Sequence, residues 1–145
     1  MATSQTRSRA GLAEDLRISI ARLSRRLRAQ GGSSLSATQH AALAAVERHG
    51  SMTPGELAEH EKVQPPSMTR VIAALEDQRL LIRSRHPTDG RQVVLNVTDK
   101  GRELLKEERR RKEAWLSRRL QELTSDERAI LRQAAPILEK LSKAG

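Results

Sequence analysis

The spacing of apolar residues predicts a chain built mainly from amphipathic helices. Near the N-terminus, aliphatic residues recur at steps of three and four, which places them on one face of a helix. This helix is predicted to end at Gly31-Gly32, and a second one runs from a Ser/Thr-rich start at residues 34–38 to Gly50. The aliphatic residues of the first helix are Leu12, Leu16, Ile20, Leu23 and Leu27.

Two short helices are predicted next. Thr53-Pro54-Gly55-Glu56 has the pattern of a capping box with proline at the first helical position, so a helix is expected from Pro54 to about Glu61. After a break at residues 62–64, Pro65-Pro66 opens another helix that extends to about Arg79. Two short helices separated by a few residues are typical of a helix-turn-helix.

A β-hairpin is predicted directly after this pair. Leu80 to His86 and Gln92 to Val97 resemble strands, and the Asp89-Gly90 step between them is a strong hairpin signal. A hairpin in this place predicts a wing beside the second helix. The cationic or titratable residues in or near it are Arg83, Arg85, His86 and Arg91.

A long helix is predicted from Thr98-Asp99-Lys100-Gly101 onward. Apolar residues occur at its two ends, whereas residues 106–112 are charged throughout. A helix that is polar on all sides typically connects two lobes through solvent. A last helix is predicted after the cap at Thr124, and Pro136 should kink it or leave one carbonyl unbonded.

These elements predict a mainly α fold with a small β-hairpin wing, organised as one continuous domain with two lobes. The lobe that carries the winged helix-turn-helix is expected at residues 34–101. A second, helical lobe is expected from residues 12–30 together with 102–145, and the family resemblance given below implies that it is a helical dimerisation lobe; a disordered basic tail is expected at residues 1–11.

The charge balance favours a polyanionic partner. The 145 residues include 27 Lys and Arg against 18 Asp and Glu, a formal net charge of +9, which suits nucleic acid or an anionic membrane surface. Trp115 is the only Trp, Tyr or Phe, so the chain lacks the aromatic platforms on which single-stranded nucleic acids stack. Double-stranded DNA is therefore the expected partner.

Several classes of protein are disfavoured. Without cysteine, the chain has no disulfide, zinc thiolate or thiol redox chemistry. No apolar stretch approaches membrane-spanning length, so we expect a cytoplasmic protein, associated with the nucleoid when bound to DNA, with no membrane partner. The four histidines show no metal-ligand spacing and no catalytic constellation is recognisable, so we expect no metal, no cofactor and no enzymatic activity.

The chain resembles the MarR family of bacterial transcription regulators from about Leu12 to the C-terminus. The most specific stretch is residues 89–101, DGRQVVLNVTDKG, which is similar to the family's wing signature and the helix start that follows it. The run from Pro66 to Arg70, and Leu75 with Leu80-Leu81, resemble the family's recognition helix and its exit. The lack of cysteine sets the chain apart from the peroxide-sensing branch.

This resemblance implies a homodimer in which the first, fifth and sixth helices of both subunits interlock. It further implies that two recognition helices enter successive major grooves of a palindromic operator, about 34 Å apart. Members of the family typically repress nearby genes and release DNA when a small phenolic or anionic ligand binds between the lobes. The residues suggest no effector site beyond Arg17 of the first helix and the neighbourhood of Trp115.

The expected DNA contacts lie in the second short helix. On a helical wheel its apolar residues Met68, Val71, Ile72 and Leu75 face inward. Pro66, Thr69 and Arg70 then face outward, with Ser67 on the flank, at the start of the helix where side chains reach base edges. We expect Ser67, Thr69 and Arg70 in the major groove; the alternative is an ordinary solvated helix face.

The remaining predicted contacts lie in the wing and at the first short helix. Arg91 resembles the family's minor-groove arginine, and Asp89 is expected to orient it by a charge-assisted hydrogen bond, although the pair could simply stiffen the turn. Gly90 stands between them, where many members carry a cation. Thr53 with two first-turn amides is expected at a phosphate or only as a cap, and His86 at a phosphate.

Two other functions remain compatible with the sequence. A winged-helix protein-interaction module would dock an acidic partner and discriminate little between DNA sequences. A nonspecific nucleoid-type protein would use the surplus of arginine to bind the phosphates of any DNA duplex, whatever its sequence.

Overall fold

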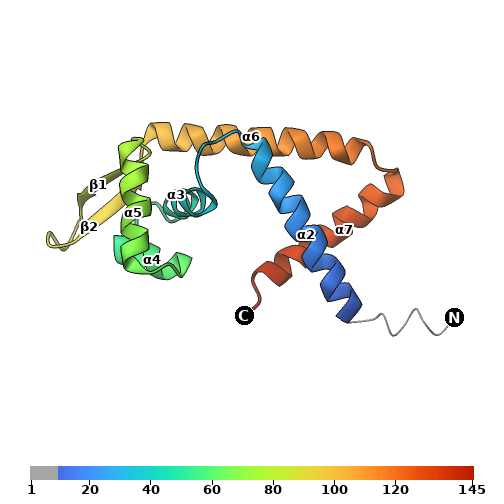
Figure 1. The fold of residues 1–145 in the computed structure, drawn as a ribbon, viewed down its shortest axis with the longest axis horizontal. Coiled ribbons are helices and arrows are strands. Elements are labelled where there is room, and N and C mark those ends of the chain that lie inside the picture. Colours follow the sequence, from blue (N-terminus) through green and yellow to red (C-terminus); the bar gives the residue numbers. More distant parts are fainter. Residues whose placement is uncertain (1–9) are drawn as a thin grey trace. The chain divides into compact units, whose positions relative to one another are not determined.

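The computed structural model describes residues 10–145, and these form six helices and one two-stranded antiparallel hairpin (Figure 1). This confirms the predicted class, mainly α with a β-hairpin wing. The predicted basic tail lies outside the described residues except for its last two positions. The elements are α2 (Ala10–Gln30), α3 (Ala37–His49), α4 (Pro54–Glu61), α5 (Pro65–Asp77), β1 (Leu81–Arg85), β2 (Val93–Val97), α6 (Asp99–Gln121) and α7 (Ser125–Ser142).

The chain divides into two compact units. Unit 1 contains the described residues up to Gly31 together with Arg110–Gly145, which includes α2, the C-terminal part of α6 and α7. Unit 2 contains Gly32–Arg109, which includes α3, α4, α5, the hairpin and the start of α6. The helix α6 therefore contributes residues to both units.

Unit 2 has an aliphatic core to which every one of its elements contributes. Helix α5 contacts α3, α4 and β1, and β2 contacts α3 and α4. The core contains no aromatic side chain. Its buried apolar residues are Ala42, Leu43, Ala45, Val46, Met52, Leu57, Ala58, Met68, Ile72, Leu75, Leu80, Leu81, Leu95, Val97 and Leu105.

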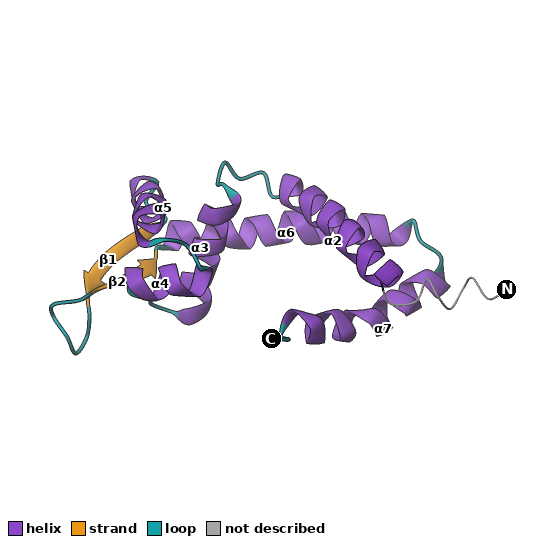
Figure 2. Cartoon of the chain, turned by 60° about the horizontal axis from the view of Figure 1, so that its bottom comes forward, coloured by secondary structure: helices purple, strands orange, loops and turns teal. Residues whose placement is uncertain are grey.

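The predicted hairpin is confirmed, with a register that pairs Leu81 with Val97 and Arg85 with Val93. Met52 adds a short bridge on the other edge of β2, because its amide donates to the Leu95 carbonyl at 3.2 Å and the Leu95 amide returns a bond of 2.7 Å. The segment between α3 and α4 thus pairs with β2, while β1 contacts α5. The loop that joins the strands extends away from the helices of unit 2 (Figure 2).

Side-chain caps fix the starts of three helices. Ser36 and Gln39 form a reciprocal capping box on α3, and Thr124 and Glu127 form another on α7. The Thr124 amide and hydroxyl lower the pKa of the Glu127 carboxyl below its ordinary value. At α4 only half of the predicted box is present among the described residues, since Thr53 Oγ1 accepts from the Glu56 amide at 3.1 Å without a return bond. Proline at the first helical position already leaves one donor fewer to cap.

Unit 1 has a different distribution of apolar residues. None of its described apolar side chains is buried within the single chain. Helix α7 continues through Pro136, whose missing amide leaves the Arg132 carbonyl without its helical bond. Large aliphatic residues of α2 and α7 are 41–63% exposed. They are Leu12, Ile20, Leu23, Ile130, Leu131, Ile137, Leu138 and Leu141.

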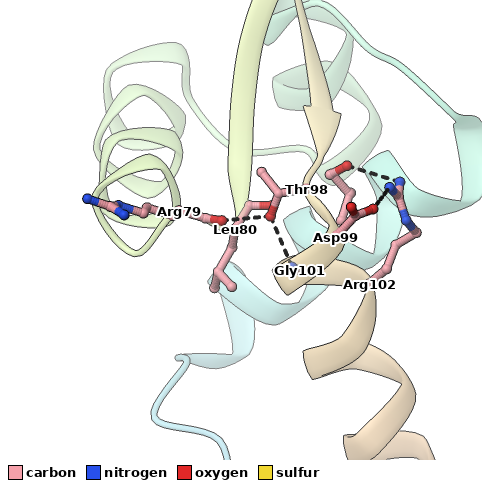
Figure 3. A network of polar contacts seen from close by, with 7 residues as sticks. Arg79, Leu80, Thr98, Asp99, Gly101 and Arg102 are labelled. Atoms are coloured by element: carbon pink, nitrogen blue, oxygen red, sulfur yellow. Dashed lines mark hydrogen bonds and ion pairs between the residues drawn. The ribbon is translucent and has the colours of Figure 1, made fainter.

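A network around Thr98 and Gly101 joins the segment that follows α5, the hairpin and α6 (Figure 3). Thr98 Oγ1 donates to the Arg79 carbonyl at 2.6 Å and accepts from the Gly101 amide at 3.0 Å. A Cβ atom on Gly101 would lie 2.5 Å from the Leu80 carbonyl oxygen and 2.7 Å from Val97 Cγ1. The Thr-x-x-Gly sequence therefore places a hydroxyl and a missing side chain where the chain segments meet.

We predict that Gly101→Ala lowers the free energy of unfolding by about 1–3 kcal/mol, because the added methyl group overlaps backbone and core atoms. Helix propensity alone would act in the opposite direction, by about 1 kcal/mol in favour of alanine. Equilibrium denaturation by urea measures the change. Gly90→Ala is the control, because a Cβ there meets no atom within 4 Å. A Gly101→Ala protein as stable as the wild type would contradict the close approach.

Candidate nucleic-acid interface

The first turns of α5 present polar side chains to solvent. Pro66, Ser67, Thr69 and Arg70 are exposed, whereas Met68, on the same turns, is buried in the core of unit 2. Ile72 and Leu75 are also buried and Val71 is half-buried against them, as the helical wheel predicts. The two prolines at the start need no amide partner, so the helix begins at the protein surface without a side-chain cap.

The polar residues of α5 differ in what they offer to a partner. The hydroxyl of Thr69 donates to the Pro65 carbonyl at 2.9 Å, so its oxygen is left to accept a hydrogen bond from a partner. Within the described part of the chain, no hydrogen bond or ion pair engages the Arg70 guanidinium. A guanidinium with all five donors available is suited to a bidentate contact with guanine or with a phosphate.

The wing turn is held by side chains that bond to its main chain. Asp89 Oδ1 accepts a hydrogen bond from the Arg91 amide at 3.1 Å. Asp89 was expected to orient the Arg91 side chain, but among residues 10–145 no ion pair links this carboxylate to the guanidinium. The carboxylate instead fixes the Arg91 backbone, as in an Asx turn, and leaves the exposed guanidinium projecting into solvent.

His86 also bonds within the turn. Its Nδ1 atom accepts from the Thr88 amide at 3.2 Å and from the Asp89 amide at 3.1 Å. The sequence predicted only a phosphate contact for this residue. The signal for the additional role is its position two and three residues before the amides of a turn, which is the spacing of a side-chain cap.

One of the expected wing cations, Arg83, forms an ion pair with a residue of α5. Arg83 Nε lies 2.9 and 3.0 Å from the two carboxylate oxygens of Glu76 on α5. This bond fastens β1 to the C-terminal part of α5. Arg85 and Arg91 are the guanidinium groups of the hairpin for which the described residues provide no ion pair.

Thr53 lies at the start of α4, where a phosphate was expected. Its hydroxyl oxygen accepts from the Glu56 amide, so that amide is already occupied. Of the two first-turn amides considered for a phosphate, the Gly55 amide remains as the donor. The geometry of Thr53 is that of a helix cap.

The charged stretch of α6 is not polar on all sides, which corrects the prediction of a helix solvated throughout residues 106–112. Glu108 is 3% exposed, and its Oε2 lies 2.6 Å from His40 Nε2 on α3. Gly101, Leu105 and Glu108 follow one another at steps of four and three, so they share the face that packs on the core of unit 2. The neighbouring imidazole allows a carboxylate to occupy this apolar face.

The surroundings of Trp115 are cationic. Arg26 of α2 stacks over the indole ring at 5.0 Å, and Arg119 of α6 lies at 5.8 Å, both within the range of cation–π contacts. Arg17, the other residue considered for an effector, precedes Arg26 by nine residues on α2, or about 13 Å along the helix axis. The structure therefore brings Arg26, and not Arg17, onto the Trp115 ring.

The other histidines pair with each other. His49 Nε2 and His60 Nε2 are 3.3 Å apart at the ends of α3 and α4. Across residues 10–145 no group of three or more His, Asp or Glu side chains is arranged to hold a metal ion. No helix in the same range is both long enough and apolar enough to cross a membrane.

Comparison with known proteins extends over nearly the whole chain. A profile of the MarR family matches residues 35–93. An uncharacterized HTH-type transcriptional regulator of Mycobacterium bovis is 49% identical over 132 residues, 90% of this chain and 92% of that protein. The HTH-type transcriptional repressor MdtR of Bacillus subtilis is 34% identical over 102 residues, 70% of this chain and 64% of its own length.

Solved structures share the fold. A transcriptional regulator protein of Pseudomonas aeruginosa superimposes with a TM-score of 0.85 at 31% identity, covering 94% of this chain and 97% of that one. A mutant MarR of E. coli in complex with operator DNA superimposes with a TM-score of 0.64 at 22% identity, covering 90% and 93% of the two chains. The match in sequence and the match in fold agree, and the chain is a member of the MarR family of helix-turn-helix transcriptional regulators.

Proposed function

We propose that this protein represses transcription as a homodimer that binds a palindromic site in double-stranded DNA. The observation that carries the proposal is the composition of the surface of unit 2. The first turns of α5 and the tip of the hairpin both expose an arginine, Arg70 and Arg91, for which the described residues provide no ion pair. The E. coli MarR mutant with the same fold was solved with operator DNA, and the relative MdtR is named a repressor.

In this proposal each element reads a different groove. Helix α5 enters the major groove, where Ser67, Thr69 and Arg70 meet base edges. The wing lies along the neighbouring minor groove, with Arg91 inserted where a narrow A·T tract concentrates negative potential. Thr53 lies near a phosphate, and Pro66 rigidifies the start of the reading helix.

The partner for unit 1 is a second copy of the chain. Most large aliphatic residues on α2 and α7 are exposed in the single chain and none is buried, and full burial of one such side chain is worth about 1.5–3 kcal/mol. Self-association through these two helices pairs like with like in a closed, two-fold symmetric arrangement. Two winged units on one dimer then match the two halves of a palindrome.

The proposal also includes the cytoplasm as the place of action, no enzymatic activity, and release from DNA by a small ligand. Trp115 with Arg26 and Arg119 offers an aromatic face and two cations, which suit an aromatic anion. The assignment of release rests on membership of the family, and these three residues are where we place the ligand.

Footprinting on the DNA upstream of the protein's own gene, across a series of salt concentrations, tests the proposal. We expect a protected palindrome that persists as salt weakens binding to unrelated duplexes. Equal affinity for all duplexes would instead identify a nonspecific nucleoid-type protein. Absence of DNA binding would favour a winged-helix module that docks an acidic protein.

We predict that Arg70→Ala weakens operator binding by about 1–3 kcal/mol and relaxes specificity at one base pair, because a bidentate base contact is lost. Fluorescence anisotropy on a set of operators with single base-pair changes measures both effects. Arg70→Lys is the matched variant, since it retains the charge without the planar fork. Uniform weakening on all duplexes, with full rescue by lysine, would make Arg70 a phosphate contact.

We predict that Arg91→Ala weakens binding most on operators with A·T-rich flanks, by about 1–2 kcal/mol, because minor-groove width controls the potential that attracts the guanidinium. The measurement compares operators that differ only in those flanks, A·T-rich against G·C-rich. Arg85→Ala serves as the control, since it removes the other hairpin guanidinium without an ion pair among the described residues and lies in β1 rather than in the turn. An equal loss on both flanks would exclude the minor-groove role.

We predict that Ile137→Glu converts the dimer to a monomer at micromolar concentration, because a carboxylate cannot be buried unpaired among aliphatic side chains. Ile137 is 61% exposed in the single chain, so the change removes little packing within it. Sedimentation equilibrium gives the mass. Arg132→Glu, on the opposite side of α7, should remain dimeric; a dimeric Ile137→Glu protein would show that α7 lies outside the interface.

A further inference from the structure

The imidazole of His86 closes the wing turn at its base. Residue 86 follows β1 directly, and the loop runs from there through residues 87–92 back to β2. The His86 amide donates to the Gln92 carbonyl at 3.0 Å, and the Gln92 amide donates to the Asp89 carbonyl at 3.0 Å. The side chain of His86 is half-buried and accepts hydrogen bonds from amides of the same loop.

The hydrogen-bond donors around the His86 imidazole define which of its two nitrogens carries the proton. The amides of Thr88 and Asp89 both point at Nδ1, at 3.2 and 3.1 Å. An amide N–H can only donate, so Nδ1 must present its lone pair and the proton of the neutral ring must be on Nε2. The Thr88 hydroxyl, 3.3 Å from the same nitrogen, is also placed to donate to it.

The turn transmits this arrangement to Arg91 through Asp89. The Asp89 amide is bonded to the imidazole, and the Asp89 carboxylate accepts the Arg91 amide. The two bonds fix the backbone on both sides of Gly90, a residue that offers no side chain of its own to stiffen the loop. The backbone position of Arg91 therefore depends on an acceptor at residue 86.

We propose that His86 is a positioning residue for the wing, which holds Arg91 ready for DNA while its imidazole is neutral and releases the turn when the imidazole is protonated. Protonation places an N–H at Nδ1 against two amide N–H groups, so attraction becomes repulsion. The charged side chains of the hairpin near the ring are Arg85, Asp89 and Arg91, and every contact that the structure gives the imidazole is to Thr88 or Asp89.

This role predicts a pH effect on DNA affinity that is opposite to the effect expected for a phosphate contact. If His86 served mainly as a cation for the DNA backbone, acidification would strengthen binding. If its neutral form caps the turn, acidification weakens binding, because Arg91 must be ordered again at the expense of affinity. The direction of the pH effect at this one residue therefore separates the two functions.

The experiment compares wild type with His86→Asn and His86→Leu, and it rests on the proposed binding of DNA. Asparagine presents an acceptor oxygen close to the position of Nδ1 and does not titrate, whereas leucine presents no acceptor. We measure operator affinity by anisotropy from about pH 8 to about pH 5.5, the range in which histidines change charge. His60→Asn is the control, since it removes another exposed imidazole of unit 2 that lies outside the wing.

At the upper end of the range, we expect wild type and His86→Asn to bind equally and His86→Leu to bind roughly 2- to 10-fold more weakly, as for the loss of one or two hydrogen bonds. On acidification the wild type should lose a similar factor relative to His86→Asn, and His60→Asn should follow the wild type. A wild type that gains affinity relative to His86→Asn, or profiles that stay parallel, would overturn the proposal.

Two further readouts separate failure of this proposal from failure of the proposed function. Nitrogen-15 spectra of the imidazole should show the proton on Nε2 in the neutral free protein, and the Thr88 and Asp89 amide signals should move when His86 titrates. A proton on Nδ1 in the free protein would refute the capping role whether or not DNA binds. A protein that binds no duplex at any pH would refute the proposed function and leave the spectra as the test of the turn.

Discussion

The close approach of Gly101 to the Leu80 carbonyl is the constraint on which the geometry of unit 2 depends. At this point the segment that follows α5, the end of the hairpin and the start of α6 are in direct contact. Arg79 takes the left-handed conformation, at φ 60°, so that the chain can leave α5 and enter β1 across only three residues. Thr98 then satisfies the carbonyl exposed by that bend, and Arg102 satisfies the Val97 carbonyl beside it. Helix and wing are consequently held as one body.

The two units solve the problem of burying apolar surface in different ways. Unit 2 encloses aliphatic residues from all of its elements, although it contains no aromatic side chain to fill space. Unit 1 encloses none within one chain. A protein with this division can keep the DNA-reading unit intact while the other unit takes its stability from association. In the proposed dimer, stability and the spacing of the two reading heads would have the same origin.

Local signals in the sequence were enough to predict the elements and their order. Prolines and caps gave α4 its bounds of Pro54 and Glu61, and the Asp89-Gly90 step gave the hairpin. These signals act within a few residues, so they survive without knowledge of the fold. Exposure of Ser67, Thr69 and Arg70 was predictable for the same reason, since helical period alone places them opposite the core. Their contacts with DNA stay predictions.

The pairings between elements could not be predicted in this way. Glu108 lies in a run of charged residues that suggests solvent on every side, and only the position of His40 on α3 explains its burial. Arg83 was counted as a wing cation because the sequence does not show that Glu76 lies opposite it. Such pairs join residues distant along the chain, so their geometry exists only after the fold is known. His86 is an intermediate case, because its partners are two and three residues away but depend on the path of the turn.

Trp115, the single aromatic residue of the types Trp, Tyr and Phe, makes one unit fluorescent and leaves the other without intrinsic fluorescence. Unit 2 contains no Trp, Tyr or Phe, so the chain's intrinsic fluorescence arises in unit 1 alone. The indole emits from between Arg26 and Arg119, and any change in the spacing of those cations alters its local field and hence its spectrum. Unit 2, which contains α5 and the hairpin, is silent at these wavelengths. A spectroscopic signal that accompanies DNA binding would therefore report, by itself, that an event at the reading heads has been transmitted along the chain to the other unit.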